Sequence, residues 1–368
     1  MRAPAAHQRY PHEVTRTFVM GDPQAPYAKL IEVLAHHGAL DGDRLAPDVV
    51  LISIGDHFDY DFQDWRTAGE NGLRFLRWLA SHDAAQVQLL LGNHDISRVM
   101  ELVAISDERF AEARAFAQAL DGDAARRARF GAAFPELPTP GLAGRDYASF
   151  TVEQRALVMA LLLAGRFLLA LVGVLPDGRE VLLTHAGVTN RELAMLGVPA
   201  APRAIADALQ VQLAQAIDRV RGDWAAGIAT PLSLEPLHVA GAAGEEGGGL
   251  LYHRPTNPER PDADRSWELT PDRPRRFDPR TLPVGLAQVA GHSGHNKCLA
   301  ELGAWSTEAA RARKHGGIRT LRLAGQTVIY DLGVAAPADE VADLILIDGE
   351  LRRVPSAECA LLPLARVG

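Results

Sequence analysis

Short apolar runs alternate with helical patterns in the first hundred residues. Residues 18–20, 49–54 and 87–91 are largely apolar, as expected of strands buried inside a protein. Between these runs, apolar residues recur at helical spacing over residues 27–37 and again around Leu76. Two consecutive strand–helix–strand units predict a sheet that is at least partly parallel and is covered on both faces.

The rest of the chain predicts one domain over residues 16–350, preceded by a loose arm over residues 1–15. We expect a helical insertion over residues 97–165 and an irregular insertion over residues 190–285. Apolar runs predict further strands at 167–175, 180–183, 286–290, 318–323, 327–330 and 344–347. An amphipathic pattern predicts a helix over residues 201–220.

Composition narrows the class of protein. The chain has 368 residues, 47% of them hydrophobic and 23% charged, so it is long enough for a large core. Its formal net charge of −8 and the absence of a basic stripe disfavour nucleic acid as a partner. Only two cysteines occur, and no signal peptide or membrane-spanning stretch is apparent. We therefore expect a cytoplasmic protein that does not contact membranes.

Polar metal-binding residues follow five of these apolar runs. Aspartate, asparagine and histidine offer the oxygen and imidazole ligands that divalent metals use. A pair of metal ions ~3.5–4 Å apart can activate water and neutralise a phosphoryl group. The five blocks are Gly21-Asp22-Pro23-Gln24, Gly55-Asp56-His57-Phe58-Asp59, Gly92-Asn93-His94-Asp95, Thr184-His185-Ala186-Gly187 and Gly291-His292-Ser293-Gly294-His295.

The order of these blocks resembles the signature of the calcineurin-like metallophosphoesterases, which is GD-x-H, GD, GNH-[DE], H and GH. The motif style is most similar to bacterial phosphoprotein-phosphatase-like members. The resemblance covers residues 17–295, and the predicted strands through about residue 348 fit the second sheet of that family. It implies an α/β fold, namely a four-layer αββα sandwich of two mixed β-sheets with helical insertions.

The resemblance also implies roles for individual residues. Asp56 would bridge two metal ions, and Asp22 would bind the first. The second metal ion would be bound by Asn93, His185 and His292.

Two further residues match the catalytic positions of the family. His94 would contact the phosphate and protonate the leaving group. Asp59 would orient the ring of His94 and raise its pKa.

Three positions depart from the family pattern. Gln24 stands where a histidine ligand is usual, so it is either a weaker ligand or lies outside the coordination sphere. Tyr60 stands where related phosphatases have a phosphate-binding arginine. The family motif GH-x-H is stretched to GH-x-x-H, so His295 either reaches the first metal or faces away.

Another arginine must then bind the phosphate, because a guanidinium group grips two phosphate oxygens at once. Arg98 lies four residues after His94, although an arginine early in a helix is usually solvated. Arg254 lies in a segment that resembles a phosphate-binding segment of bacterial relatives. We interpret His57 as a bystander beside Asp56.

These residues predict a metal-dependent phosphoesterase, a hydrolase that cleaves a phosphomonoester or phosphoprotein through in-line attack of metal-bound hydroxide. The cofactors would be two divalent or mixed-valence metal ions, with manganese, iron or zinc as candidates. The partner would be a phosphorylated small molecule or protein. One alternative is a nucleotide or dinucleoside polyphosphate hydrolase. Another is a metal-binding interaction module whose catalysis is impaired by Gln24 and Tyr60.

Overall fold

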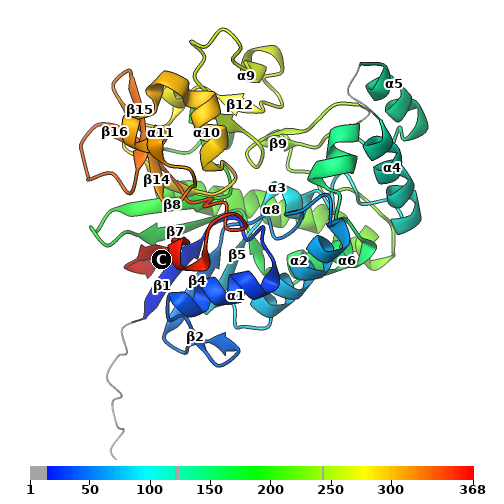
Figure 1. The fold of residues 1–368 in the computed structure, drawn as a ribbon, viewed down its shortest axis with the longest axis horizontal. Helices are drawn as coiled ribbons and strands as arrows, with labels where there is room; N and C mark the ends of the chain where they lie inside the picture. The colour runs from blue at the N-terminus through cyan, green and yellow to red at the C-terminus, as the bar shows by residue number, and fades with distance from the viewer. Residues whose placement is uncertain (1–14, 121–123, 243) are drawn as a thin grey trace, which may run out of the picture.

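The computed structural model describes residues 15–120, 124–242 and 244–368, so all but the last residue of the expected N-terminal arm lies outside it. Two mixed sheets dominate this part of the chain (Figure 1). The five-stranded sheet has the order β17 (Leu362–Leu364), β1 (Arg16–Met20), β4 (Val49–Ser53), β5 (Val87–Leu90) and β6 (Phe167–Leu168). The seven-stranded sheet has the order β15 (Thr327–Leu332), β14 (Arg319–Ala324), β16 (Val341–Leu346), β13 (Ala287–Ala290), β8 (Glu180–Thr184), β7 (Ala170–Val174) and β18 (Arg366–Val367).

Apolar side chains of the two sheets pack against each other. Successive residues of a strand point to opposite faces, so each strand supplies this inner layer with alternate residues. Fully buried members of the layer include Val19, Ile52, Leu183, Val289 and Ile345. The largest core cluster covers the outer face of the five-stranded sheet and continues beneath α8 (Pro202–Ala225) on β7 and β8, and a third cluster lies on the outer face of β14 and β16.

Helices cover both outer faces. The longer helices are α1 (Tyr27–His36), α2 (Trp65–Ala80), α4 (Asp107–Ala119), α5 (Ala124–Ala133), α6 (Val152–Leu163), α8 (Pro202–Ala225) and α10 (His295–Leu302). Helices α1, α2 and α6 pack on the five-stranded sheet, whereas α8 packs on β7 and β8 of the other sheet. The expected αββα sandwich of two mixed sheets is therefore confirmed.

Short elements complete the fold. The short helices are α3 (Asn93–Ile96), η1 (Leu142–Asp146), α7 (Asn190–Leu196), α9 (Ser266–Leu269), η2 (Pro279–Thr281), η3 (Gly303–Trp305), α11 (Glu308–Ala312) and η4 (Ser356–Glu358). Three two-stranded sheets pair β2 (Leu40–Asp41) with β3 (Arg44–Leu45), β9 (His238–Val239) with β10 (Gly248–Gly249), and β11 (Arg254–Pro255) with β12 (Arg276–Phe277). Among the described helices, none combines the length and hydrophobicity needed to cross a membrane.

Residues 97–165 are mainly helical, and α4, α5 and η1 enclose a small core of their own at one side of the molecule (Figure 1). The helix predicted over residues 201–220 is confirmed as α8, and α7 precedes it at the start of the insertion 190–285. Beyond α8, the described residues of this segment form short strands and the short helices α9 and η2.

Two features differ from the sequence expectations. The predicted strand 167–175 is divided, because β6 joins one sheet and β7 joins the other, with Leu169 between them. The chain also continues past the expected end of the domain at residue 350, and β17 and β18 extend both sheets. Local apolar patterns predict a strand but do not reveal which sheet pairs with it.

The topology explains why distant motifs meet. Strands β1, β4 and β5 are parallel within one sheet, and β8 and β13 are parallel within the other. Their carboxyl ends are followed by Asp22, Asp56, Asn93, His185 and His292. All five residues therefore gather at the end of the sandwich where the two sheets face each other.

Candidate metal centre

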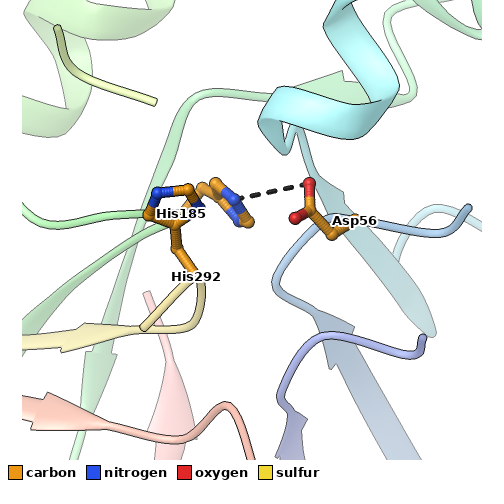
Figure 2. A group of neighbouring side chains, drawn as sticks. All are labelled: Asp56, His185 and His292. Atoms are coloured by element: carbon orange, nitrogen blue, oxygen red, sulfur yellow. Dashed lines mark ion pairs between the residues drawn. The ribbon is translucent and has the colours of Figure 1, made fainter. Parts of the chain in front are cut away.

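Three metal-binding side chains converge at this end of the sandwich. Figure 2 shows Asp56, His185 and His292 pointing toward one another, each from a different loop. One ligand atom of each lies within 4.8 Å of the other two. The Nε2 atom of His185 is 3.4 Å from Oδ1 of Asp56. All three residues are buried, so these groups meet in a place with little competing water.

Backbone carbonyl groups fix the tautomers of both histidines. The carbonyl of Ile54 lies 2.9 Å from Nδ1 of His185, and the carbonyl of Tyr252 lies 2.9 Å from Nε2 of His292. A carbonyl can only accept, so each of these ring nitrogens must carry the proton. When the ring is neutral, its other nitrogen offers a lone pair to a metal ion. Metal-binding histidines are commonly oriented in this way.

The free nitrogens fit a metal ion. Nδ1 of His292 is buried and has no hydrogen-bond partner among the described residues. Nε2 of His185 faces Oδ1 of Asn93 at 3.1 Å. An unpaired buried nitrogen costs free energy, and coordination to a metal ion would remove that cost. The donor set of one carboxylate, one amide oxygen and two imidazoles suits zinc, iron or manganese.

The charges of the site are strongly coupled. Burial favours the neutral ring of His185, but the Asp56 carboxylate outweighs it and raises the pKa of His185 to about 9. Burial opposes the charged form of Asp56, yet His185 and His94 hold its pKa below the usual range. Burial, followed by the repulsion of Asp348, raises the pKa of Asp22. The charged forms of these buried carboxylates therefore require positive charge nearby.

A single aspartate, Asp95, holds the loop that carries Asp56. Asp95 is fully buried and accepts hydrogen bonds from the backbone N–H groups of Gly92 and Asp56 at 2.9 Å each. It also accepts from the backbone of His57 at 3.1 Å and binds the ring of His57 at 3.0 Å. Asp56 has a φ of 61°, which is unusual for a residue other than glycine. His57 is therefore part of the support for Asp56 rather than a bystander.

The glycines before Asn93 and His292 allow close packing of the loops. A side chain at Gly291 would collide with the carboxylate of Asp22, and one at Gly92 would collide with Asp56. With no side chain at Gly291, the backbone N–H of His292 donates to both oxygens of Asp22 at 3.0 Å. The Gly-Asp, Gly-Asn and Gly-His pairs in the sequence reflect this close approach.

A charged triad stands beside the metal ligands. Nδ1 of His94 lies 3.0 Å from Oδ2 of Asp59, and Nε2 lies 3.8 Å from Oδ2 of Asp56. Arg98 donates to the same oxygen of Asp59 at 2.6 Å, and Ser149 donates to the other oxygen at 2.6 Å. Burial lowers the pKa of His94, but Asp56 and Asp59 together raise it. The side chain of His94 is 14% exposed, so its ring can reach a bound molecule.

Arg98 does not occupy the position expected of a phosphate-binding arginine. It is completely buried, and its guanidinium donates to Asp59, Gln154, Ser97 and the carbonyl of His94. All of its donor nitrogens are therefore used inside the protein.

Arg254 is half-buried and reaches the carbonyl of His292 through Nε at 3.4 Å. Among the described residues, its two terminal nitrogens donate no hydrogen bond, so they remain available to an anion.

Gln24 and His295, the two further residues considered as ligands of a first metal ion, are placed differently. Gln24 lies near Asp22, and its Nε2 donates to the carbonyl of Phe58 at 3.0 Å, which leaves its amide oxygen free. His295 begins α10, and its Nδ1 lies 2.8 Å from the hydroxyl of Tyr330. Its Nε2 lies 3.2 Å from the carbonyl of Ala310. Both ring nitrogens are engaged away from Asp22, so the structure does not bring His295 to the centre.

Sequence reasoning missed several supporting residues. Asp95 stands in the Gly-Asn-His-Asp block, so its place in the motif was a usable signal. Ser149 and Gln154 come from the helical insertion and hold Asp59 and Arg98. Asp348 follows β16 and lies near Asp22. No local pattern marks these last three, because only the fold brings them to the site.

Comparison with protein-family models gives one match. A family model described as calcineurin-like phosphoesterase matches residues 15–194. No curated protein sequence matches the chain. A solved structure, the cold-active protein-tyrosine phosphatase of a psychrophile, Shewanella sp., is similar at 12% identity and a TM-score of 0.37. That similarity covers 92% of this chain and 72% of the other.

Proposed function

We propose that this chain, which matches the calcineurin-like phosphoesterase model over residues 15–194, hydrolyses phosphomonoesters or phosphoproteins at a dinuclear metal centre. The match supports a metal-dependent hydrolase of phosphate esters. The metal ions would supply an activated water and neutralise phosphoryl charge. One position would be held by Asp56, Asn93, His185 and His292, and the other by Asp22 and Asp56, with Gln24 as a further oxygen donor.

The placement of His94 supports the proposal most directly. The side chain of His94 is partly exposed, and Asp59 fixes the orientation of its ring through Nδ1. Its other ring nitrogen, Nε2, lies 3.8 Å from Oδ2 of Asp56 and so faces the metal ligands. The raised pKa keeps the ring protonated toward neutral pH, as a proton donor to a leaving alkoxide requires. A site without catalysis would have no need of this oriented acid.

The rest of the triad positions His94. Arg98 binds Asp59 and also lies with its guanidinium carbon 4.7 Å from the ring centre of Phe58. Gln154 caps the start of α6 together with Thr151 and accepts from Arg98. The acid is thereby tied to a helix of the sandwich, so its geometry does not depend on a mobile loop.

Two cations are available to the phosphate. Arg254 has free terminal nitrogens and lies beside the carbonyl of His292. The repulsion of Arg254 lowers the pKa of Lys297 to about 8, so the two positive charges must lie near each other. An anion between them would relieve this repulsion. Arg254, with Lys297 as a second cation, would then replace the arginine that is missing at Tyr60.

Turnover of a panel of substrates with manganese tests the proposal. The panel contains p-nitrophenyl phosphate, bis-p-nitrophenyl phosphate, a phosphopeptide and diadenosine tetraphosphate. We expect the monoester and the phosphopeptide to be cleaved faster than the diester. Preference for the dinucleotide would instead favour a polyphosphate hydrolase. Bound metal without turnover of any of the four would favour a non-catalytic module.

A further inference from the structure

A hollow of mixed charge lies beside Asp22. Its volume is about 180 Å³, and its lining includes Gln24, Gly294, the carboxylates of Asp22, Asp348 and Glu350, and the cations of Lys297, Arg352 and Arg353. The residues that line it contribute oxygen ligands but no imidazole. His295 does not reach it, because both of its ring nitrogens bind other groups.

Asp348 lies near Asp22 because the two sheets pack face to face. It follows β16 of the seven-stranded sheet, whereas Asp22 follows β1 of the other sheet. A side chain at Gly21 would collide with the carbonyl of Ile347, and its Cβ would lie 3.2 Å from the Cα of Asp348. The chain that carries Asp348 therefore lies directly against the chain that carries Asp22.

The carboxylate of Asp348 takes up the space beside Gly294. A Cβ at Gly294 would lie 3.1 Å from Oδ2 of Asp348. The other oxygen, Oδ1, accepts the backbone N–H of Glu350 at 3.1 Å, which fixes the orientation of the group. The stretched Gly-His-x-x-His spacing puts glycine two residues after His292, and the carboxylate occupies the room that a side chain would need there.

Gln24 adds a fourth oxygen donor. Its Nε2 is tied to the carbonyl of Phe58, so its amide is oriented and its oxygen accepts no hydrogen bond from the described residues. Asp22 is 3% exposed, and Asp56 is 2% exposed. Repulsion by Asp348 and Asp56 acts on the buried carboxylate of Asp22, and nearby positive charge would offset it.

We propose that Asp348 is a ligand of the first metal ion, which makes the first position an all-oxygen site of Asp22, Gln24, Asp56 and Asp348. Such a donor set selects a hard ion such as Mn²⁺ or Mg²⁺. The second position has two imidazoles and therefore tolerates zinc or iron. The inference rests on the metal centre of the proposed function and adds which residue completes it and which ion it selects.

Metal titration of a single substitution tests the role of Asp348. Metal-free wild-type protein and the Asp348→Asn variant are titrated with Mn²⁺, and bound metal is measured by elemental analysis and calorimetry. We expect two ions in the wild type. In the variant, one ion should bind at least ~10–100-fold more weakly, since even indirect partners of a metal contribute that much. Thermal unfolding of both proteins checks that the variant is folded.

Glu350→Gln is the matched control. Glu350 lines the same hollow, but its carboxylate binds the amide of Asn296 at 3.1 Å and 3.2 Å. This control should bind two Mn²⁺ ions as the wild type does. Two tight ions in Asp348→Asn would overturn the proposal, as would a wild type that binds only one ion. An equal loss in Glu350→Gln would also overturn it, because the effect would then reflect general charge.

A double substitution tests whether metal binding can be restored by a new ligand, which would not happen if Asp348 had only a structural role. Gly294 has a φ of −62°, which any residue adopts, and Asp348→Ala removes the carboxylate that fills its space. Gly294→His in the Asp348→Ala background should restore the weakened ion and shift its preference from Mn²⁺ toward Zn²⁺. These binding results do not depend on turnover, so a failure of the proposed activity would be recognised separately with p-nitrophenyl phosphate.

Discussion

The two sides of the metal centre are built differently. On the side of His185 and His292, both rings are buried and each is held by a backbone carbonyl of a neighbouring loop. On the side of Asp22, the donors are oxygens around an open hollow, and Gln24 is only half-buried. One side is therefore fixed by backbone carbonyl groups, whereas the other includes the partly exposed side chain of Gln24.

This difference explains where the sequence departs from the family pattern. When a histidine N–H donates a hydrogen bond to a buried backbone carbonyl, substitution of that histidine leaves the carbonyl without a partner. A metal ligand that lies beside a hollow can be replaced by a residue that reaches the same place from a different strand. All three departures, at Gln24, Tyr60 and His295, fall on the open side or on the phosphate contact.

The largest expected effect comes from the fixed side. His185→Ala should remove the metal ion held with Asn93 and His292 and lower turnover by at least ~10³-fold, because a catalytic metal ion contributes several kcal/mol. Gln24→Ala is the matched change on the open side and should cost much less. Metal content and turnover of p-nitrophenyl phosphate measure both variants. Equal losses in the two variants would remove the contrast between the sides.

His94→Ala should lower turnover by at least ~10²-fold, as expected when a general acid is lost, and leave the metal content unchanged. The loss should be larger for an alkyl phosphate than for p-nitrophenyl phosphate, because p-nitrophenolate leaves without needing a proton. Steady-state rates on both substrates provide the comparison. Unchanged turnover on the alkyl substrate would exclude His94 as the acid.

Metal binding on the fixed side should depend on pH. With a pKa of about 9 in the metal-free protein, His185 holds a proton at neutral pH that a metal ion must displace. Apparent affinity should therefore rise with pH, by up to about tenfold per unit, and level off above pH 9. Competition with a chromophoric chelator between pH 6 and pH 9.5 measures this. A flat profile would contradict the assigned protonation of His185.

The arginines should separate binding from positioning. Arg98→Lys should lower kcat by about tenfold and leave KM unchanged, because Arg98 holds Asp59 and has no free donor for the substrate. Arg254→Lys should mainly raise KM for the phosphate ester. Steady-state kinetics distinguish the two. A raised KM with constant kcat in Arg98→Lys would return Arg98 to the phosphate-binding role expected from its sequence position.

The smallest expected effect is a gain on the open side. Gln24→His should tighten binding of the first metal ion several-fold and move its preference toward zinc, because an imidazole replaces an amide oxygen. Calorimetric titration of the metal-free variant with Mn²⁺ and Zn²⁺ measures this. Weaker binding of the first ion would count against Gln24 as a ligand.

Most of the fold followed from local patterns. The apolar runs before Asp22, Asp56 and Asn93 predicted β1, β4 and β5, since a buried parallel strand is a continuous apolar segment. The same logic failed for residues 167–175, whose two halves pair in different sheets. It also missed β17 and β18, which are short strands at the edges. Pairing partners are not encoded in a local apolar pattern.

The sequence by itself determined the chemical type of the site, because glycine followed by aspartate, asparagine or histidine at strand ends is a local feature. Only the tertiary structure decided the orientation of each group. It turned His295 toward Tyr330, buried Arg98 behind His94, and brought Asp348 from the other sheet to Asp22. These outcomes depend on contacts between segments far apart in the chain, and side-chain direction is set by the neighbours that the fold supplies.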